Sequence, residues 1–387
     1  MPVTSTSLRH KRVVTVLYSL ELGGAERQAT ALARYLSSAE GAQVEVWAFI
    51  GPGKAADLCE EYGIAWRLVS AIPWPKSDID VGRSAVTLSR HLRRFRPDAV
   101  LSYLLYPNVV TAFARRFART PFHLWNQRNP GTEKLPLRFA GLAARSADVC
   151  VANSQEGREY LRRTLKVPEK RLKVVPNGVT LSPPVKTRAA WRRDLNIEES
   201  SPVACMLANI TSYKDYPTLL RAWRLVVDRW GPKPNRPVLL LAGREGDAFE
   251  QIRSLVSDLG LENVVWFLGA VDDVASLLNA VEIGVLSSPS EGCPNAVLEY
   301  MASGLPVAGS DVAGIRDVLP PEGLPFLSPC GDANGLAVTL ERLLADKDLR
   351  LSLGDKNRHW AEHEFSFDAQ CRKAASLIKE GIALRHR

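Results

Sequence analysis

The chain has 387 residues, of which 46% are hydrophobic and 24% charged, a composition that excludes a disordered or fibrous protein and a length that suits two domains. Its formal net charge of +8 is uneven: residues 1–180 hold 27 Lys and Arg against 15 Asp and Glu (+12), and the remainder holds 23 against 27 (−4). Scattered cysteines, a polar start and no run of about 18 apolar residues lead us to expect a cytoplasmic protein without a disulfide framework, signal peptide or membrane span.

The first half of the chain alternates short apolar, β-branched segments with helical patterns. The expected strands are 12–20, 42–50, 65–70, 97–104, 121–127 and 148–154, and the expected helices are 25–38, 54–63, 82–95, 109–118 and 137–147. Strands that alternate with helices of about a dozen residues predict a parallel sheet covered on both faces.

A proline-rich stretch at 171–192 interrupts this alternation and predicts a linker near residue 180. Beyond it the expected strands are 202–210, 236–244, 264–269, 282–288, 305–311 and 323–329, and the expected helices are 216–230, 248–260, 274–281, 294–302, 332–346, 348–363 and 367–384. We therefore predict an α/β protein with two doubly wound Rossmann-like domains, 1–180 and 181–366, facing a central cleft. We expect a C-terminal helix within 367–387 to pack back on the first domain.

The stretch PSEGCPNAVLEYMASGLPV carries Glu291 and Glu299, eight positions apart. Pro294 suits the first turn of a helix and Gly304 the position just past its end, so a short helix is expected between them. The two glutamate backbones then lie roughly 10–12 Å apart along the axis, which favours a hold on a long ligand over a pair that cleaves one glycosidic bond. The free N–H groups of the helix start favour a phosphate between them. An extended sugar–diphosphate–ribose unit has this order and length.

This stretch closely resembles the E-x7-E signature of the retaining glycosyltransferases of family 4, which have the two-Rossmann GT-B fold. Four further segments resemble the family in the same order: SLELGGAERQATALARYL, VVPNGV, SYKDYPTLLRAW and WFLGAVDDVASLLNAVEIGVLSSPSEG. They look like the glycine-rich loop after the first strand, the interdomain segment, the phosphate-binding lysine region and the nucleotide-side strand with its loop. The resemblance covers nearly the whole chain.

The resemblance implies roles for individual residues. Glu291 and Lys214 would be catalytic, because Glu291 would hydrogen-bond the donor-sugar hydroxyls and Lys214 would neutralise the leaving diphosphate. The implied donor-binding residues are Gly24, Asn209, Gly243, Val271, Asn295, Ala296 and Glu299. Among these, the backbone of Asn295 and Ala296 would meet the diphosphate, and Glu299 would bind the ribose. No metal ion and no other cofactor would be required.

Two positions depart from the family pattern. Asn209 stands where the family usually has an arginine before the lysine, so less positive charge faces the diphosphate, and Arg244 or Arg128 are the candidates to replace it. Many members also have a histidine at the tip of the strand that reads FHLWNQRN here. His123 lies too early in that strand, and we interpret it as a core-edge residue. We expect Trp125 and Arg128 on the acceptor side.

Two further features allow more than one interpretation. Asp78 and Asp80 form a DxD pair that would suit a metal-dependent transferase of another class, but the pair lies before a basic helix, and we interpret it as a chance match. The basic first half, with SRHLRRFRP and ARRFART, would suit an anionic membrane surface or phosphorylated substrates, or is only a set of solvated arginine faces. No nucleic-acid module accompanies the charge, so we expect no nucleic-acid partner.

The sequence thus predicts a retaining, metal-independent, hexosyltransferase-like enzyme. It would move a sugar from a nucleoside-diphosphate sugar, with UDP favoured, to a hydroxyl of a glycan or lipid-linked acceptor, in the cytoplasm or at the inner face of a membrane. A sugar-nucleotide epimerase of related fold stays an alternative, although its acid/base residues have no clear counterparts. A non-catalytic sugar-nucleotide-binding protein is a second alternative, favoured if the missing arginine abolishes turnover.

Overall fold

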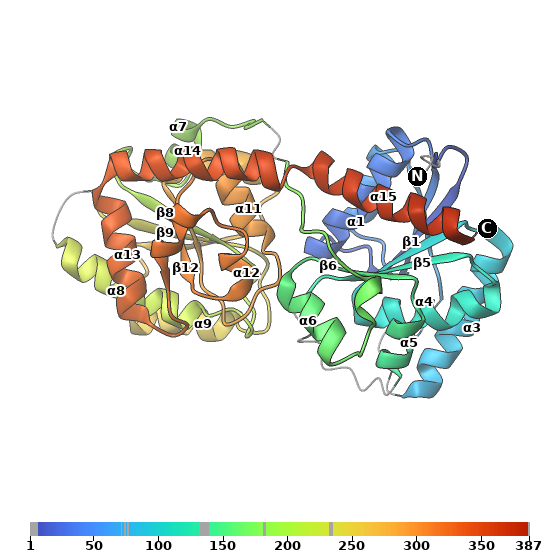
Figure 1. The fold of residues 1–387 in the computed structure, drawn as a ribbon. Helices are drawn as coiled ribbons and strands as arrows, with labels where there is room; N and C mark the ends of the chain where they lie inside the picture. The colour runs from blue at the N-terminus through green and yellow to red at the C-terminus, as the bar shows by residue number, and fades with distance from the viewer. Residues whose placement is uncertain are drawn as a thin grey trace. The chain divides into compact units, whose positions relative to one another are not determined.

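The computed structural model describes residues 7–70, 72, 75, 77–129, 131, 139–180, 183–231 and 235–385. The chain divides into two compact units. Unit 1 comprises Met1–Gly178 and Phe367–Arg387, and unit 2 comprises Val179–Ser366. Each unit has one sheet of parallel strands with helices packed on it (Figure 1). The predicted pair of doubly wound Rossmann-like folds is confirmed.

The sheet of unit 1, in the part that the structure describes, has seven strands in the order β3-β2-β1-β4-β5-β6-β7. They are β1 Arg12–Ser19, β2 Gln43–Ile50, β3 Ala65–Leu68, β4 Ala99–Tyr103, β5 Phe122–Gln127, β6 Val149–Ala152 and β7 Leu172–Val174. The helices of this unit are α1 Gly24–Ser38, α2 Lys54–Glu61, α3 Asp78–Phe95, α4 Leu105–Ala118, α5 Ala140–Ser146, α6 Gln155–Arg163, the 3-10 turn η1 Glu169–Arg171 and α15 Phe367–Arg385.

The sheet of unit 1 separates two hydrophobic cores, because successive side chains of a strand point to opposite faces. Val13 and Leu17 of β1 belong to the core that α1, α2 and α15 cover, whereas Val14 and Val16 belong to the core under α3, α4 and α5. Helix α15 lies beside α1 (Figure 1). It packs so closely that a Cβ at Gly381 would lie 2.0 Å from the ring of Phe122 in β5.

The sequence patterns missed three elements of unit 1: α6, the 3-10 turn η1 and β7. Strand β7 has only three residues and lies in the stretch that we interpreted as the start of the linker, yet it pairs in register with β6 through Ala152 and Val174. Three residues are too few for an alternating pattern to stand out. Helix α3 also begins earlier than expected, at Asp78, because Ser77 caps it by hydrogen bonds to the backbone (3.4 Å) and carboxylate (3.1 Å) of Asp80.

Within the described residues, unit 2 has six parallel strands in the order β10-β9-β8-β11-β12-β13. They are β8 Val203–Leu207, β9 Val238–Ala242, β10 Val265–Gly269, β11 Ile283–Leu286, β12 Val307–Ser310 and β13 Leu327–Ser328. The helices are α7 Arg188–Asp194, α8 Tyr216–Trp230, α9 Phe249–Asp258, α10 Val274–Asn279, α11 Asn295–Ala302, α12 Ala313–Arg316, η2 Pro321–Phe326, α13 Ala333–Ala345 and α14 Lys347–Glu364. The strand expected at 323–329 is mostly the 3-10 turn η2, and only two of its residues pair with β12.

The chain passes from one unit to the other after Gly178 and again before Phe367. Within unit 1, the carboxamide of Gln28 in α1 holds both backbone groups of Gly178, donating to its oxygen (2.8 Å) and accepting from its N–H (3.0 Å). Within unit 2, the N–H of Val179 donates to the oxygen of Phe365 at 2.9 Å. Each side of the first crossing is therefore fixed by hydrogen bonds inside its own unit.

Candidate functional site

The strand order of unit 2 reverses between β8 and β11, which are neighbours in its sheet. After β8 the chain continues through α8 to β9 on one side, and after β11 it continues through α11 to β12 on the other. In open α/β sheets, ligands bind beyond the carboxyl ends of the strands at such a reversal. Loops 208–215 and 287–294 therefore form the expected ligand site of unit 2.

Lys214 and Glu291 come from these two loops, and their side chains form an ion pair. Both side chains are largely buried, with 16% of the lysine and 12% of the glutamate exposed. The backbones of the loops are also joined, because the N–H of Asp215 donates to the oxygen of Ser287 at 3.1 Å. The structure thus brings together two residues that lie 77 positions apart, with opposite charges at the carboxyl edge of the sheet.

The loop after β8 is held in place by its own hydrogen bonds. Asp247 accepts from the N–H (3.0 Å) and the hydroxyl (2.6 Å) of Ser212, and these bonds lower the pKa of Asp247 below its ordinary value. The N–H of Lys214 donates to the oxygen of Thr211 at 3.0 Å. The next residue, Asp215, caps α8 with its carboxylate. Lys214 is therefore fixed directly before a helix start.

Asn209 and Gly243 hold the ends of β8 and β9 together. The carboxamide oxygen of Asn209 accepts the N–H of Arg244 at 3.0 Å, and the N–H of Ile210 donates to the oxygen of Arg244 at 3.0 Å. A Cβ at Gly243 would lie 2.0 Å from the backbone oxygen of Ala208, so only glycine fits there. Both residues have roles in the internal structure of the site, whatever they contribute to a ligand.

Val271 lies at the same edge, two residues beyond β10, and packs partly buried against the core of unit 2. The helix expected at 274–281 follows directly as α10, and Asp273 caps it by accepting the N–H of Ser276 at 3.0 Å.

Helix α11 begins at Asn295, with Pro294 as its N-cap, one residue later than predicted. Pro294 makes no side-chain capping hydrogen bond, and the N–H of Leu298 donates to its oxygen at 3.3 Å. Asn295 and Ala296 are partly exposed. The predicted end is confirmed, since Gly304 follows the helix in the left-handed conformation (φ 71°). The positive end of the helix dipole favours an anion beside these first residues.

Tyr300 is a residue of the site that the sequence patterns did not single out. Its neighbour Glu299 is 9% exposed, and Tyr300 itself is fully buried. The Tyr300 hydroxyl accepts the N–H of Leu207 (2.6 Å) and donates to the oxygen of Val285 (3.1 Å), and so ties β8 to β11 where they separate. Burial raises the pKa of Tyr300 well above its ordinary value. A tyrosine on the buried face of a predicted helix would have indicated such a hydrogen bond, because a buried hydroxyl needs a partner.

Gly314 of α12 is a second such residue. A Cβ at this position would lie 2.2 Å from the backbone oxygen of Glu291 and 2.3 Å from that of Gly292. The same loop is held by Ser288, whose N–H donates to the hydroxyl of Ser310 at 3.0 Å. The place of Glu291 therefore depends on a glycine more than twenty residues further along the chain.

Two family profiles match this chain. The family described as Glycosyl transferases group 1 matches residues 187–360, and the family described as Glycosyltransferase Family 4 matches residues 22–182. Together the two matches cover most of the chain. This chain belongs to glycosyltransferase family 4.

Named relatives of the transferase include N-acetyl-alpha-D-glucosaminyl L-malate synthase of Bacillus anthracis, which is 31% identical over 174 residues. That match spans 45% of this chain and 44% of the relative, less than half of either protein. The lipopolysaccharide core biosynthesis glycosyltransferase LpsE of Rhizobium meliloti is 26% identical over 283 residues, which cover 72% of this chain and 74% of LpsE. The crystal structure of Anabaena HepE in complex with UDP and glucose has a TM-score of 0.83 at 20% identity, covering 96% of this chain and 100% of HepE, and supports the GT-B fold.

In unit 1 of the transferase, Gly24 and Arg128 lie at the carboxyl edge of the sheet. Gly24 is the first residue of α1, which follows β1, and Arg128 directly follows β5. The guanidinium of Arg128 donates to the side-chain oxygens of Asn177 (3.1 Å) and Asn126 (3.3 Å) and lies 5.1 Å from the ring centre of Tyr103. These contacts fix the arginine that was predicted on the acceptor side.

The structure corrects the prediction for Trp125. This side chain is fully buried in the core under α3 and α4, and its indole N–H donates to the side-chain oxygen of Gln127 at 3.3 Å. A tryptophan inside the core offers no surface to an acceptor. The sequence placed Trp125 near the strand tip but did not show that it points into the core.

His123 is also fully buried, and its Nε2 lies 2.8 Å from the hydroxyl of Ser102. Ser102 donates its proton to Asn108, so Nε2 of the imidazole carries the hydrogen that reaches Ser102. Burial, with a smaller effect of Arg115, lowers the pKa of His123 to about 3. His123 is therefore a neutral core residue of the transferase.

Proposed function

We propose that this protein is a retaining glycosyltransferase that moves a sugar from a UDP-sugar to a hydroxyl of a glycan or lipid-linked acceptor. The observation that carries the proposal is the ion pair of Lys214 and Glu291 at the β8–β11 reversal. The loop that supplies Glu291 leads directly into the N-terminus of α11. A cation, a helix N-terminus and a carboxylate are thus available to a ligand that carries both a diphosphate and a sugar.

Donor binding would exchange an internal ion pair for two contacts with the ligand. The diphosphate is a stronger partner for the ammonium of Lys214 than a single carboxylate, because it carries more negative charge. Glu291, released from Lys214, would accept hydrogen bonds from sugar hydroxyls. Negative charge grows on the diphosphate as the glycosidic bond breaks, so Lys214 would stabilise the transition state more than the bound donor.

Other residues would complete donor recognition. The backbone N–H groups of Asn295 and Ala296 would bind the diphosphate, and the shielded carboxylate of Glu299 would hold the ribose hydroxyls. Asn209 would add a neutral hydrogen bond, and Val271 would lie near the base. In this scheme the phosphate charge is met by Lys214 and the start of α11, and no metal ion is required.

Three further residues complete the proposal. Gly24, with no Cβ, would allow a phosphate to come close to the backbone, and Gly243 would line the donor site. Arg128 is the proposed acceptor-side residue. By resemblance to the family, the sugar would be transferred with retention, the leaving phosphate helping to take the proton of the acceptor hydroxyl.

Two relatives favour the finer assignments. HepE was crystallised with UDP and glucose, which supports UDP as the carrier here. LpsE acts in lipopolysaccharide core biosynthesis, which supports a glycan or lipid-linked acceptor. Such an acceptor also fits the predicted position of the protein at the inner face of a membrane.

The test is to incubate the protein with a panel of UDP-, GDP- and ADP-sugars and to follow the products by NMR. The proposal expects slow release of UDP with a free sugar of the same anomeric configuration, and no release in a Lys214→Ala variant. A different sugar nucleotide as product would identify an epimerase. Binding of every donor without any release would identify a non-catalytic protein.

A further inference from the structure

Helices α3 and α4 of unit 1 carry an unusually basic surface. Residues 81–119 contain eight arginines and one acidic residue, Asp98. That carboxylate already pairs with Lys11 at 3.0 Å, and Arg115 is buried in an ion pair with Asp148. The exposed arginines of this segment are Arg83, Arg90, Arg93, Arg94, Arg96, Arg116 and Arg119. Asp98 is thus neutralised by Lys11. Of the exposed arginines, Arg83 lies 3.9 Å from Asp80, which with Asp78 makes the first turn of α3 acidic, and the other six arginines give the surface its charge.

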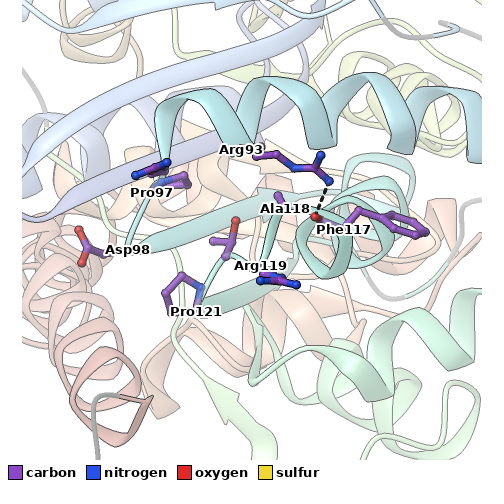
Figure 2. Close-up of a pocket in the computed structure, with 9 residues that line it drawn as sticks. Arg93, Pro97, Asp98, Phe117, Ala118, Arg119 and Pro121 are labelled. Carbon is purple, nitrogen blue, oxygen red and sulfur yellow. Dashed lines mark hydrogen bonds between the residues drawn. The ribbon is translucent and has the colours of Figure 1, made fainter.

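Where α3 and α4 end, a cavity of about 660 Å³ opens between them (Figure 2). Its charged lining residues are Arg93, Arg96, Arg119 and Asp98. The guanidinium of Arg93 donates to the backbone oxygen of Phe117 (2.8 Å), and that of Arg12 donates to the oxygen of Phe95 (2.6 Å). These bonds cover carbonyls at the two helix ends, which would otherwise repel an anion. The cavity is therefore suited to a phosphate.

An apolar groove of about 360 Å³ adjoins this cavity and shares Phe117 with it. Its apolar lining residues are Val81, Ala85, Val86, Val109, Phe113, Phe117 and Phe139. Phe117 is 60% exposed, and Ile79, seven residues before Val86 on the same side of α3, is 67% exposed. A row of exposed apolar side chains beside a basic cavity indicates a binding surface rather than a face that meets only water.

We propose that this α3–α4 surface, formed by the arginine cavity and the adjoining apolar groove, docks the protein on an anionic bilayer. Lipid phosphates would occupy the arginine cavity, because guanidinium groups bind phosphate through two hydrogen bonds. Phe117 and Ile79 would enter the boundary between headgroups and acyl chains. Among the described residues, no helix combines the length and the apolar character that crossing a bilayer requires.

The apolar groove decides between a lipid and other anionic partners. Nucleic acid would also bind arginines, but its phosphate backbone offers nothing to a groove of valines and phenylalanines. A bilayer offers both phosphates and acyl chains at a separation of one headgroup. The proposal deepens the proposed function, because it names the membrane surface at which the protein would bind a lipid-linked acceptor. Its structural argument uses only residues of unit 1, and it can be tested without measuring sugar transfer.

The first test is co-sedimentation of the full chain with vesicles of phosphatidylcholine containing phosphatidylglycerol, at low salt. The wild type should pellet with these vesicles, stay in solution with pure phosphatidylcholine, and lose part of its binding to the anionic vesicles as salt rises. Changing Arg94, Arg96, Arg116 and Arg119 to Gln should lower the partition coefficient at least about a hundredfold. The matched control changes four exposed arginines elsewhere, Arg193, Arg221, Arg236 and Arg372, to Gln, and should bind within about threefold of the wild type.

The second test addresses the apolar side chains. Ile79→Gln with Phe117→Gln should remove the binding that persists at high salt. Val185→Gln with Val338→Gln, which changes two exposed apolar residues elsewhere, should not. The proposal is overturned if the wild type stays in solution with the anionic vesicles, if both quadruple variants lose binding equally, or if millimolar inorganic phosphate alone releases the protein. Thermal melting and UDP binding of each variant show that the protein is folded. If the wild type does not bind UDP, this counts against the proposed function but does not affect the result on membrane docking.

Discussion

At the scale of single residues, the ion pair of Lys214 and Glu291 has two effects. It holds the two side chains in place, and it makes Glu291 compete with a diphosphate for Lys214. The lysine that would hold a diphosphate is already held by a largely buried carboxylate. Removing either group therefore changes what the other can do. The two single substitutions are expected to act on UDP affinity in opposite directions.

Lys214→Ala should weaken UDP binding by about 2 kcal/mol or more, because Glu291 is then left unpaired beside the diphosphate. Glu291→Gln should strengthen UDP binding by up to about 1 kcal/mol, because Lys214 no longer has to leave a carboxylate. The same Glu291→Gln change should weaken discrimination between a UDP-sugar and UDP. Calorimetry with UDP on both variants checks this, and equal losses of affinity would contradict the exchange of partners.

Tyr300 provides a residue-scale test of the switch point. Tyr300→Phe leaves the N–H of Leu207 and the oxygen of Val285 without this hydroxyl, so the unfolding free energy of unit 2 should fall by about 1–3 kcal/mol. The control is Tyr213→Phe, which removes a hydroxyl from an exposed side chain and should change stability by less than about 0.5 kcal/mol. Urea unfolding of both variants makes the comparison, and similar midpoints would show that the Tyr300 hydrogen bonds contribute little.

At the scale of elements, the sequence predicted the strands and helices that have a repeating hydrophobic pattern. It missed the features that depend on contacts between distant parts of the chain. Apolar strands alternating with helices predicted both sheets, and Pro294 and Gly304 predicted α11 to within one residue. Strand β7 was missed because its three residues show no pattern of their own. The direction of Trp125 was missed because every residue of β5 is buried. The sequence of such a strand does not show which of the two faces a given side chain points to.

The residues of the candidate site also fall into a predicted group and an unpredicted group. Lys214 and Glu291 were predicted from their motifs, and the strand order explains why the two loops meet. Tyr300 and Gly314 were not predicted, because each acts through a backbone atom of a segment far along the chain. Such contacts carry no local sequence pattern. They become visible only when the elements are packed together.

Gly314 gives the element-scale prediction. Gly314→Ala places a methyl group against two backbone oxygens of the loop that carries Glu291, so that loop must shift. Sugar transfer should fall at least about tenfold, since a displacement of about 1 Å at a reacting group has effects of this size or larger. Gly323→Ala is the control in the same unit, because its nearest new contact would be at an ordinary 3.5 Å. Unchanged turnover in Gly314→Ala would show that the loop tolerates the methyl group.

At the scale of the whole molecule, a buried histidine links the stability of unit 1 to pH. His123 has its pKa lowered to about 3 by burial and by Arg115, whereas an unfolded chain has an ordinary histidine pKa of about 6.5. Between these values the unfolded state binds a proton that the folded state does not. The unfolding free energy of unit 1 should therefore fall as the pH falls below about 6.5, by up to about 1.4 kcal/mol per unit, and stay level above it.

His123→Gln should remove this slope, since glutamine does not titrate. Urea unfolding at several pH values between 4.5 and 7.5 measures it for both proteins. His359→Gln, at an exposed position, is the control and should keep the wild-type slope. Parallel pH profiles of the wild type and His123→Gln would mean that other groups determine the acid sensitivity.

Unit 1 is interrupted in the sequence by the whole of unit 2, and this has a consequence for the order of events during synthesis. The face of β5 and α1 that receives Ile378 and Ile382 stays uncovered until α15 has left the ribosome. At about 5–20 residues per second, translation of unit 2 takes roughly 10–40 s, during which the first 178 residues wait with an open core. Unit 2, although made second, is the first to have all its residues. The nascent chain is therefore expected to complete its folding from the middle outward, and the unfinished N-terminal sheet is the part most in need of a chaperone.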